Sequence, residues 1–220
     1  MMNNMKLEYM FWGPLVTKTI VDNHVITELL KRGEIVRNLN NDARDGLAGH
    51  IDNEFNYKDE DRKWFMSNVG HHFNAYIKHK ETEWKKQTPK VHSLELDTLW
   101  INYMKKNEYN PPHFHKGYLS FVLYLQVPEI IKEDAKKFKS ASEGPGAIEF
   151  IYGQEDRLGD FICSHIKFPK AGEMYIFPSN LYHTVHPFRS DVERISISGN
   201  LIAKFKESKE GEHCSLLYEW

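Results

Sequence analysis

Cysteine is scarce in this sequence of 220 residues, which contains only Cys163 and Cys214. Two cysteines so far apart provide neither a disulfide framework nor a CxxC metal-binding motif. Proteins without disulfides are typical of reducing compartments. We therefore expect a cytoplasmic protein.

Long apolar runs and a large net charge of either sign are also missing. No stretch approaches the roughly 20 apolar residues that cross a bilayer. The start, MMNNMKLEYMFWGP, lacks the basic region and sustained apolar run of a signal peptide. Lys and Arg number 29 and Asp and Glu number 31, a net charge of −2, which excludes the basic footprint of a nucleic-acid-binding protein. We expect neither a membrane nor a nucleic-acid partner.

The remaining composition is that of a globular protein, with 40% hydrophobic and 13% aromatic residues. The length suits one domain. We expect a single domain over residues 1–220, composed of a mostly helical N-terminal layer (1–93), a jelly-roll core (94–205) and a C-terminal tail (206–220).

Two segments of the N-terminal part have helical periodicity. Residues 16–33 place apolar side chains near a 3.6-residue spacing, and Gly33 is the predicted C-cap. Residues 59–87 open with acids and carry a broad apolar stripe, which predicts an amphipathic helix with a break near Gly70. The adjacent His71-His72 pair lies inside this helix, where neighbours do not share a face, so the pair is a poor metal clamp.

From residue 94 the apolar pattern alternates, which is typical of β-strands. Short strands separated by Gly and Pro indicate a sandwich or jelly roll, so the predicted fold class is mainly β with an N-terminal helical layer (α+β). A short helix over Glu129–Lys139 interrupts the strands and is followed by a polar loop to Gly146, a candidate lid. The predicted strands are 94–104, 118–127, 147–152, 163–168, 173–177 and 194–202.

Three histidines stand out in this half. His113 and His115 are two residues apart, so in an extended segment their side chains point the same way. His183, which follows FPSNLY, could complete one face of a metal site and leave the other face open, as non-haem Fe(II) oxygenases require. His186 lies three positions later and should face away, in a supporting or structural role.

A second group of polar side chains could bind a carboxylate. Arg194, Ser196 and Ser198 share one face of a predicted strand, opposite two buried isoleucines. A guanidinium beside a hydroxyl forms a bidentate carboxylate site. The alternative is a salt bridge from Arg194 to a nearby acid. Asn102 and Tyr124, on two other predicted strands, could add hydrogen bonds.

The blocks WINYMKKNEYNPPHFHKGYLSFVLYLQVP, FPKAGEMYIFPSNLYHTVHPF and ERISISGN resemble a family of 2-oxoglutarate/Fe(II)-dependent oxygenases. Members of this family occur in marine bacteria and in phages of cyanobacteria, and they are grouped with prolyl-hydroxylase-like enzymes. The resemblance covers about residues 96–202. For a phage-encoded member, the compartment would be the host cytoplasm.

The resemblance implies a double-stranded β-helix fold and an enzyme that uses Fe(II), 2-oxoglutarate and dioxygen to hydroxylate a C–H bond. His113 and His183 would be metal ligands, and Arg194, assisted by Ser196, would bind the distal carboxylate of 2-oxoglutarate. His115 departs from the wider superfamily, where Asp is usual. Either His115 is the third ligand, or a water takes that place.

Two other functions fit the same residues. A cupin-type metalloenzyme also uses HxH with a distant His, although the Glu usual near such a motif is missing after His115. A non-enzymatic jelly-roll binding module is the other alternative. For the oxygenase we expect a small-molecule, peptide or protein substrate, with proline as the favoured side chain. A homodimer is a possible oligomeric state.

Overall fold

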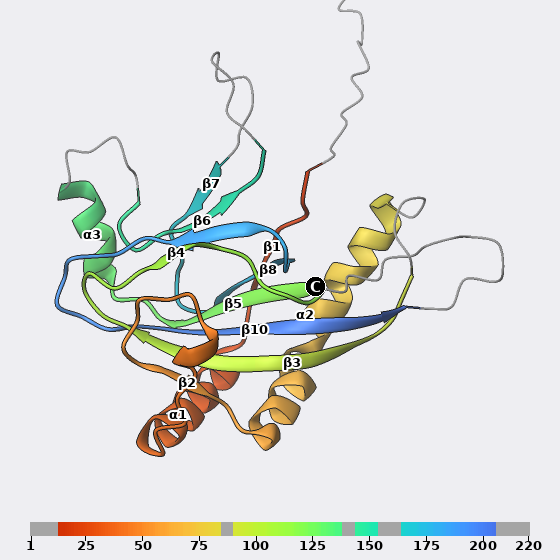
Figure 1. The fold of residues 1–220 in the computed structure, drawn as a ribbon, viewed down its shortest axis with the longest axis horizontal. Coiled ribbons are helices and arrows are strands. Elements are labelled where there is room, and N and C mark those ends of the chain that lie inside the picture. Colours follow the sequence, from red (N-terminus) through yellow and green to blue (C-terminus); the bar gives the residue numbers. More distant parts are fainter. Residues whose placement is uncertain (1–12, 85–89, 138–143, 154–163, 206–220) are drawn as a thin grey trace, which may run out of the picture.

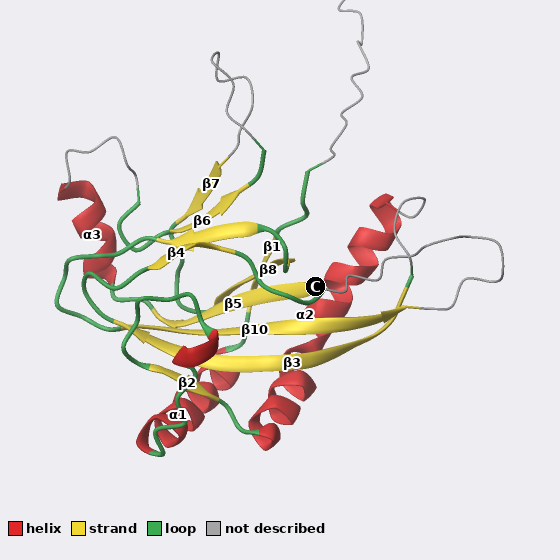
Figure 2. Ribbon diagram, viewed as in Figure 1, coloured by secondary structure: helices red, strands yellow, loops and turns green. Residues whose placement is uncertain are grey.

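The computed structural model describes residues 13–84, 90–137, 144–153 and 164–205. Within these ranges the chain forms two antiparallel sheets and three α-helices (Figures 1 and 2). The helices are α1 (Asn23–Asn38), α2 (Asp59–Trp84) and α3 (Glu129–Lys137). The strands are β1 (Thr17–Ile20), β2 (Glu54–Asn56), β3 (Val91–Met104), β4 (Asn110–His113), β5 (Leu119–Gln126), β6 (Ile148–Ile151), β7 (Ser164–Lys167), β8 (Glu173–Pro178), β9 (Tyr182–Val185) and β10 (Arg194–Phe205).

The large sheet has the strand order β1-β8-β5-β10-β3-β2, and the small sheet has the order β4-β9-β6-β7. The two strands from the N-terminal part, β1 and β2, form the two edges of the large sheet. The longest pairing joins β10 to β3, beginning with Arg194 opposite Met104. These central strands therefore provide a continuous platform beneath the small sheet.

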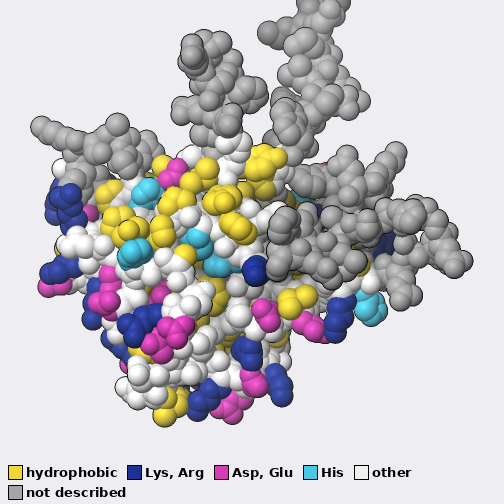
Figure 3. Space-filling view, viewed as in Figure 1, with side chains coloured by type: hydrophobic (Ala, Val, Ile, Leu, Met, Phe, Trp, Pro, Cys, Tyr) yellow, Lys and Arg dark blue, Asp and Glu magenta, His cyan; other side chains and the backbone are white. Residues whose placement is uncertain are grey.

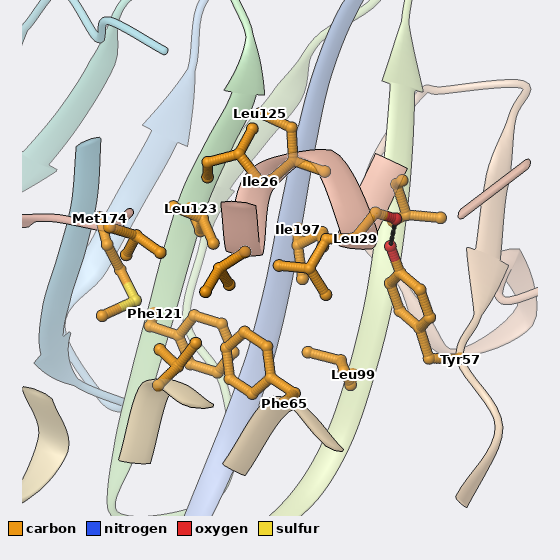
Figure 4. Close-up of a cluster of buried hydrophobic side chains, with 14 of the residues drawn as sticks. Ile26, Leu29, Tyr57, Phe65, Leu99, Phe121, Leu123, Leu125, Met174 and Ile197 are labelled. Carbon is orange, nitrogen blue, oxygen red and sulfur yellow. Dashed lines mark hydrogen bonds between the residues drawn. The ribbon is translucent and has the colours of Figure 1, made fainter. Parts of the chain in front are cut away.

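Helices α1 and α2 cover the outer face of the large sheet (Figure 1). Apolar side chains from both helices and from the sheet form one buried cluster between them. In its centre Phe121 of β5 stacks on Phe65 of α2, with ring centroids 5.1 Å apart. The Tyr57 hydroxyl donates a hydrogen bond to the Leu29 carbonyl at 2.9 Å (Figure 4), so this polar atom is satisfied within the cluster.

A second apolar cluster lies between the two sheets. It contains Val122 and Tyr124 of the large sheet, Phe150 of the small sheet and Ile131 of α3. Helix α3 thus packs against this cluster rather than against the outer helices. Because side chains alternate along a strand, the inner and outer faces of the large sheet serve two separate clusters.

The helix predicted over residues 16–33 is wrong at both ends. Residues 17–20 form strand β1, because three of these four residues are β-branched, which favours a strand, and because β8 offers an edge to pair with. Helix α1 then runs from Asn23 through Gly33 to Asn38, so Gly33 is not a C-cap. A Cβ at Gly33 would lie 2.4 Å from Ile101 Cδ1. Glycine therefore allows the helix to approach β3 closely.

The second predicted helix is confirmed, but its predicted break is wrong. Helix α2 continues through Gly70, where an added Cβ would lie 3.6 Å from Met66 Cε, an ordinary contact. The predicted stripe is the buried face, since Phe65, Val69 and Phe73 are inaccessible to solvent. The last predicted residues of this helix, 85–87, lie outside the described residues.

Most strands predicted after residue 94 are confirmed within one to three residues, apart from Cys163, which lies outside the described part. The short helix α3 is also confirmed. The sequence patterns missed β1, β2, β4 and β9, each three or four residues long. Among the described residues no helix is long and apolar enough to cross a membrane.

Candidate metal centre and adjoining cavity

Three histidines come together between the ends of β4 and β9. His113 closes β4 and is the register partner of His183 in β9, and His115 follows two residues after His113. Their candidate ligand atoms all lie within 4.8 Å of one another. The alternation of side chains therefore aims all three rings at one point, as the HxH spacing predicts.

Two of the three rings are held by backbone carbonyls. His113 Nδ1 lies 2.7 Å from the Pro111 carbonyl, and His183 Nδ1 lies 2.9 Å from the Leu181 carbonyl. A nitrogen next to a carbonyl oxygen carries the proton, which leaves Nε2 with a free lone pair. Fixing the tautomer through the second nitrogen is the usual way in which a protein prepares a histidine to bind a metal.

His115 is held differently. Its backbone N–H donates to the Ser179 carbonyl at 2.8 Å. Its ring lies edge-on to Trp100, with centroids 5.8 Å apart. The backbone contact and the indole therefore determine its position.

Burial keeps all three rings neutral. Loss of hydration lowers the pKa of His113, lowers that of His115 to about 4, and lowers that of His183 to about 3. Proximity to the other histidines adds to the effect for His115 and His183. Neutral imidazoles are the ligand form that Fe(II) and Zn(II) require, so the cluster fits a divalent metal.

A small polar cavity adjoins this cluster on the inner face of the large sheet. Arg194, Ser196 and Ser198 of β10 line the cavity together with His113 and His183. Ser196 is the register partner of Asn102 in β3 and of Tyr124 in β5, and both of these residues also line the cavity.

Arg194 is the most unusual residue of the cavity because its charge is buried with no acidic partner in the described part of the chain. Its side chain is 2% exposed. Nη1 donates to the Gly146 carbonyl at 2.8 Å, Nη2 contacts Met104 Sδ, and Nε has no partner. Burial lowers the pKa of Arg194, but arginine remains protonated in proteins.

The alternative salt bridge of Arg194 is not observed among the described residues. Glu193 instead pairs with Arg37 at 3.2 Å, and Asp191 pairs with Lys106 at 3.1 Å. An uncompensated buried charge costs several kcal/mol, so an anionic ligand is the expected partner of Arg194.

Two further polar groups of the cavity have no hydrogen-bond partner within the described ranges. They are the Tyr124 hydroxyl and the Asn102 Oδ1 atom, and both are buried. Burial raises the pKa of Tyr124 to about 12, so its hydroxyl remains a donor. The Asn102 amide nitrogen makes only long contacts of 3.4 Å with Ser196 and Ser198. The cavity therefore offers several hydrogen-bonding groups to a polar ligand.

The histidines predicted not to bind metal lie elsewhere. His186 Nε2 is 2.7 Å from Glu149 Oε2, so this ring has a structural partner outside the cluster. His71 and His72 belong to α2, on the other side of the large sheet, and the His72 ring contacts Thr19 Oγ1 at 3.1 Å. The sequence patterns did not identify the Gly146 carbonyl as a hydrogen-bond partner of Arg194. A backbone carbonyl can come from any residue type, so the sequence does not indicate it.

A larger hollow of about 650 Å³ shares no lining residue with the polar cavity. Its walls include Phe150, Tyr175 and Lys18, at the β1 and β7 edges of the sheets. The hollow contains only one histidine, His165, and no described metal cluster. On the face shown in Figure 3, histidines lie among hydrophobic side chains, whereas charged side chains gather below them.

A family model described as "Putative 2OG-Fe(II) oxygenase" matches residues 98–200. This segment contains all three histidines and every cavity residue that the sequence predicted. Together with a cluster that could hold iron, the match confirms the prediction of a 2-oxoglutarate-dependent oxygenase that uses Fe(II) and dioxygen. Neither the cupin-type enzyme nor the binding module is favoured.

Solved structures similar to this chain include three prolyl hydroxylases. The 2OG complex of a viral collagen prolyl hydroxylase from Paramecium Bursaria Chlorella virus-1 has a TM-score of 0.53 and 11% identity, covering 84% of this chain and 94% of that chain. A Pseudomonas putida prolyl-4-hydroxylase has a TM-score of 0.54 and 15% identity, covering 86% and 92%.

The third structure is a Trichoplax adhaerens prolyl hydroxylase in complex with a hypoxia inducible factor peptide fragment. It has a TM-score of 0.54 and 11% identity, covering 87% of this chain and 83% of that chain. At such identities these likenesses establish the fold alone. A comparison with curated proteins finds no match.

Proposed function

We propose that this Fe(II)- and 2-oxoglutarate-dependent oxygenase holds its metal through His113, His115 and His183 and binds the distal carboxylate of 2-oxoglutarate through Arg194. The observation that carries the proposal is the buried Arg194 guanidinium, which has no described acidic partner and lines the same cavity as two of the histidines. A dianionic co-substrate would neutralise this charge.

Each residue has a distinct task in this proposal. Arg194 provides a planar fork of donors for the carboxylate, and Ser196 and the Tyr124 hydroxyl add neutral donors. The Asn102 amide orients the neighbouring serines. A bound Fe(II) would supply the one-electron chemistry by which dioxygen is reduced, while the protein positions the reactants.

The cavity of about 40 Å³ is small for a five-carbon dicarboxylate. We propose that a side chain of the cavity wall moves when the co-substrate binds. Asn102 is the side chain expected to move, because its hydrogen bonds are the longest in the cavity at 3.4 Å.

Apolar side chains around the cavity would exclude water. Trp100, Val122, Ile148 and Phe177 line the cavity together with the polar groups. Such a surrounding lowers the local dielectric constant and strengthens the contact between Arg194 and a carboxylate.

We propose an uncharged aliphatic side chain, with proline as the favoured one, as the site of hydroxylation. Phe114 and Tyr182, the residues next to His113 and His183, are 52% and 49% exposed, and their rings pack with centroids 5.1 Å apart. An exposed aromatic pair suits a compact apolar ring. The similarity in fold to three prolyl hydroxylases supports this choice.

We also propose that the two sheets form a jelly roll within a single domain. Two sets of four strands support this proposal, β3-β10-β5-β8 in the large sheet and β4-β9-β6-β7 in the small sheet, because a jelly roll consists of eight strands in two sheets. The scarcity of cysteine supports the cytoplasm as its compartment.

The first test is an anaerobic titration of the Fe(II)-loaded protein with 2-oxoglutarate, monitored by the visible charge-transfer band of a chelated 2-oxoacid. We expect a band in the wild-type protein, a band shifted to much higher 2-oxoglutarate concentrations in Arg194→Ala, and no band in His183→Ala. His71→Gln, which changes an exposed histidine of α2, is the matched control and should behave as wild type. Bound iron without a band would overturn the co-substrate assignment.

The substrate is tested separately with proline-containing peptides and with the same peptides in which valine replaces proline. We expect a mass increase of one oxygen on the proline peptides and release of succinate. Hydroxylation of the valine peptides alone would refute the preference for proline and leave the co-substrate site standing.

A further inference from the structure

Arg194 has one described oxygen partner, and that partner belongs to a surface excursion of the chain. The excursion, described over residues 128–137 and 144–146, contains α3 and ends at Gly146, whose carbonyl accepts the hydrogen bond from Nη1 at 2.8 Å. A guanidinium is selective for carboxylates because its donors form a rigid plane. The group that holds one edge of this plane determines where the remaining donors point.

The Gly146 carbonyl is itself held in place. The Gly146 N–H donates to the Pro187 carbonyl at 3.2 Å, and the next residue, Ala147, donates to the Gly144 carbonyl at 2.9 Å and accepts from the His186 N–H at 2.9 Å. Backbone hydrogen bonds of Gly146 and Ala147 therefore hold the peptide unit that faces Arg194.

Gly146 is also in a conformation that other residues rarely adopt. Its φ angle is +75°, and a Cβ at this position would lie 2.3 Å from Cγ2 of Ile131 in α3. Ile131 is 3% exposed and belongs to the cluster between the sheets, so it cannot swing into solvent without cost. The close contact places α3 directly against the peptide unit that binds Arg194.

Helix α3 has a second attachment, to the segment that leads into β10. The Asp134 carboxylate, which is 9% exposed, accepts hydrogen bonds from the Ser190 backbone N–H at 2.8 Å and from the Ser190 hydroxyl. The excursion is thus attached to the protein at Gly146 and at Ser190, and Arg194 lies four residues after Ser190.

We propose that Gly146 is the positioning residue for Arg194, and that the α3 excursion is a brace that sets the plane of the guanidinium for the 2-oxoglutarate carboxylate. This inference rests on the proposed function of Arg194. It assigns the excursion a role in co-substrate affinity that involves no opening or closing.

The test compares two glycine variants. Gly146→Ala adds a methyl group that meets Ile131. Gly153→Ala is the matched control, because Gly153 has a similar φ of +83° but nothing within 4 Å of its Cβ position. Both variants bear the strain of a left-handed alanine, and only Gly146→Ala disturbs the brace. We expect Gly146→Ala to raise the dissociation constant for 2-oxoglutarate by roughly tenfold or more, the range for an outer-sphere partner, and to leave Fe(II) affinity within about twofold.

A rescue variant separates positioning from general damage. Ile131→Ala/Gly146→Ala removes the clash, so we expect it to recover most of the lost 2-oxoglutarate affinity. A folded Gly146→Ala protein with unchanged 2-oxoglutarate affinity would overturn the proposal, as would equal losses of Fe(II) and 2-oxoglutarate affinity or a double variant without recovery.

Asp134→Ala provides an independent route if Gly146→Ala does not fold. This change releases α3 from Ser190, and it should weaken 2-oxoglutarate binding about threefold, whereas Glu133→Ala on the exposed side of α3 should not. Equal affinities in these two variants would refute the brace.

The two proposals fail in different ways. Absence of 2-oxoglutarate binding in the wild-type protein refutes the proposed function. Loss of binding in Arg194→Ala with full binding in Gly146→Ala refutes only the brace.

Discussion

The two faces of the large sheet are formed by the same strands but differ in what they contain. On β10, Ile195 and Ile197 face the helices and are 6% and 0% exposed. Arg194 and Ser196 alternate with them, are equally buried, and line the polar cavity. Burial alone therefore does not distinguish the core from the site, whereas the chemical character of each face does.

Apolar burial on the outer face can offset the free energy lost to unsatisfied polar groups on the inner face. Burial of apolar side chains against α1 and α2 stabilises the sheet by roughly 25 cal/mol per Å². On the opposite face, Arg194 Nε, Tyr124 Oη and Asn102 Oδ1 are buried without hydrogen bonds, and each unsatisfied group costs about 1–3 kcal/mol. A rigid outer face holds these groups in place until a ligand satisfies them.

The largest effect is expected at the metal cluster. His183→Ala removes a ring that has its tautomer fixed by Leu181, so Fe(II) affinity should fall by more than the roughly 10- to 100-fold seen when an outer-sphere partner is removed. Competition with a chromogenic chelator measures this loss. Fe(II) affinity equal to that of the wild-type protein would show that the cluster is not the metal site.

A pair of neighbouring substitutions on β10 tests whether the faces are independent. Ile197→Ala should lower the free energy of unfolding by about 2–5 kcal/mol and leave 2-oxoglutarate affinity unchanged. Ser196→Ala should change stability by less than about 1 kcal/mol and weaken 2-oxoglutarate binding several-fold. Urea unfolding and anaerobic titration provide the two measurements. Similar binding losses in both variants would break the comparison.

Arg194→Met tests how much the buried charge on the inner face lowers the free energy of unfolding. Methionine fills similar space without a charge, so the metal-free protein should become more stable by about 1–4 kcal/mol, as other buried ionic groups do when replaced by apolar ones. The same variant should lose 2-oxoglutarate chelation. A destabilised variant would show that the guanidinium is held for the fold rather than for a ligand.

The smallest effect is expected at Glu54, on the inner face opposite Asn102. Burial, with repulsion from Glu108, raises its pKa from 4.5 to about 7. Below pH 4.5 the folded and unfolded states are both protonated. As the pH rises from 4.5 to about 7, only the unfolded state ionises readily, so the free energy of unfolding falls. Above about pH 7 the folded state ionises as well, and the fall ends.

Glu54→Gln removes this dependence. The variant should be of similar stability to the wild-type protein at pH 4 and more stable by the order of 2 kcal/mol at pH 8. Parallel urea curves at the two pH values measure the difference. A constant difference across this range would show that Glu54 ionises normally.

The sequence predicted the two faces because they depend on alternation alone. The side chains of β10 and β3 lie on the faces that a period of two requires, and His113, His115 and His183 meet as the HxH spacing indicates. The roles of these residues in binding Fe(II) and 2-oxoglutarate remain predictions.

What the sequence did not reveal depends on tertiary partners. Strand β4 contains Pro111 and Pro112, which obscure a strand pattern, and its pairing with β9 is irregular between Asn110 and His113. Gly33 resembles a helix end but lies where α1 meets Ile101. The contact between Arg194 and Gly146 joins residues 48 positions apart. No pattern of neighbouring residues in the sequence indicates any of these three features.

The placement of β1 and β2 has a consequence for how the protein behaves at high concentration. These short strands occupy both edges of the large sheet, and they shield the longer β8 and β3 from neighbouring molecules. A chain beginning after residue 56 would keep the metal cluster and every cavity residue except Ile51, but it would leave two long edges able to pair between molecules. The two N-terminal strands thus cover edges of the sheet, a task separate from catalysis.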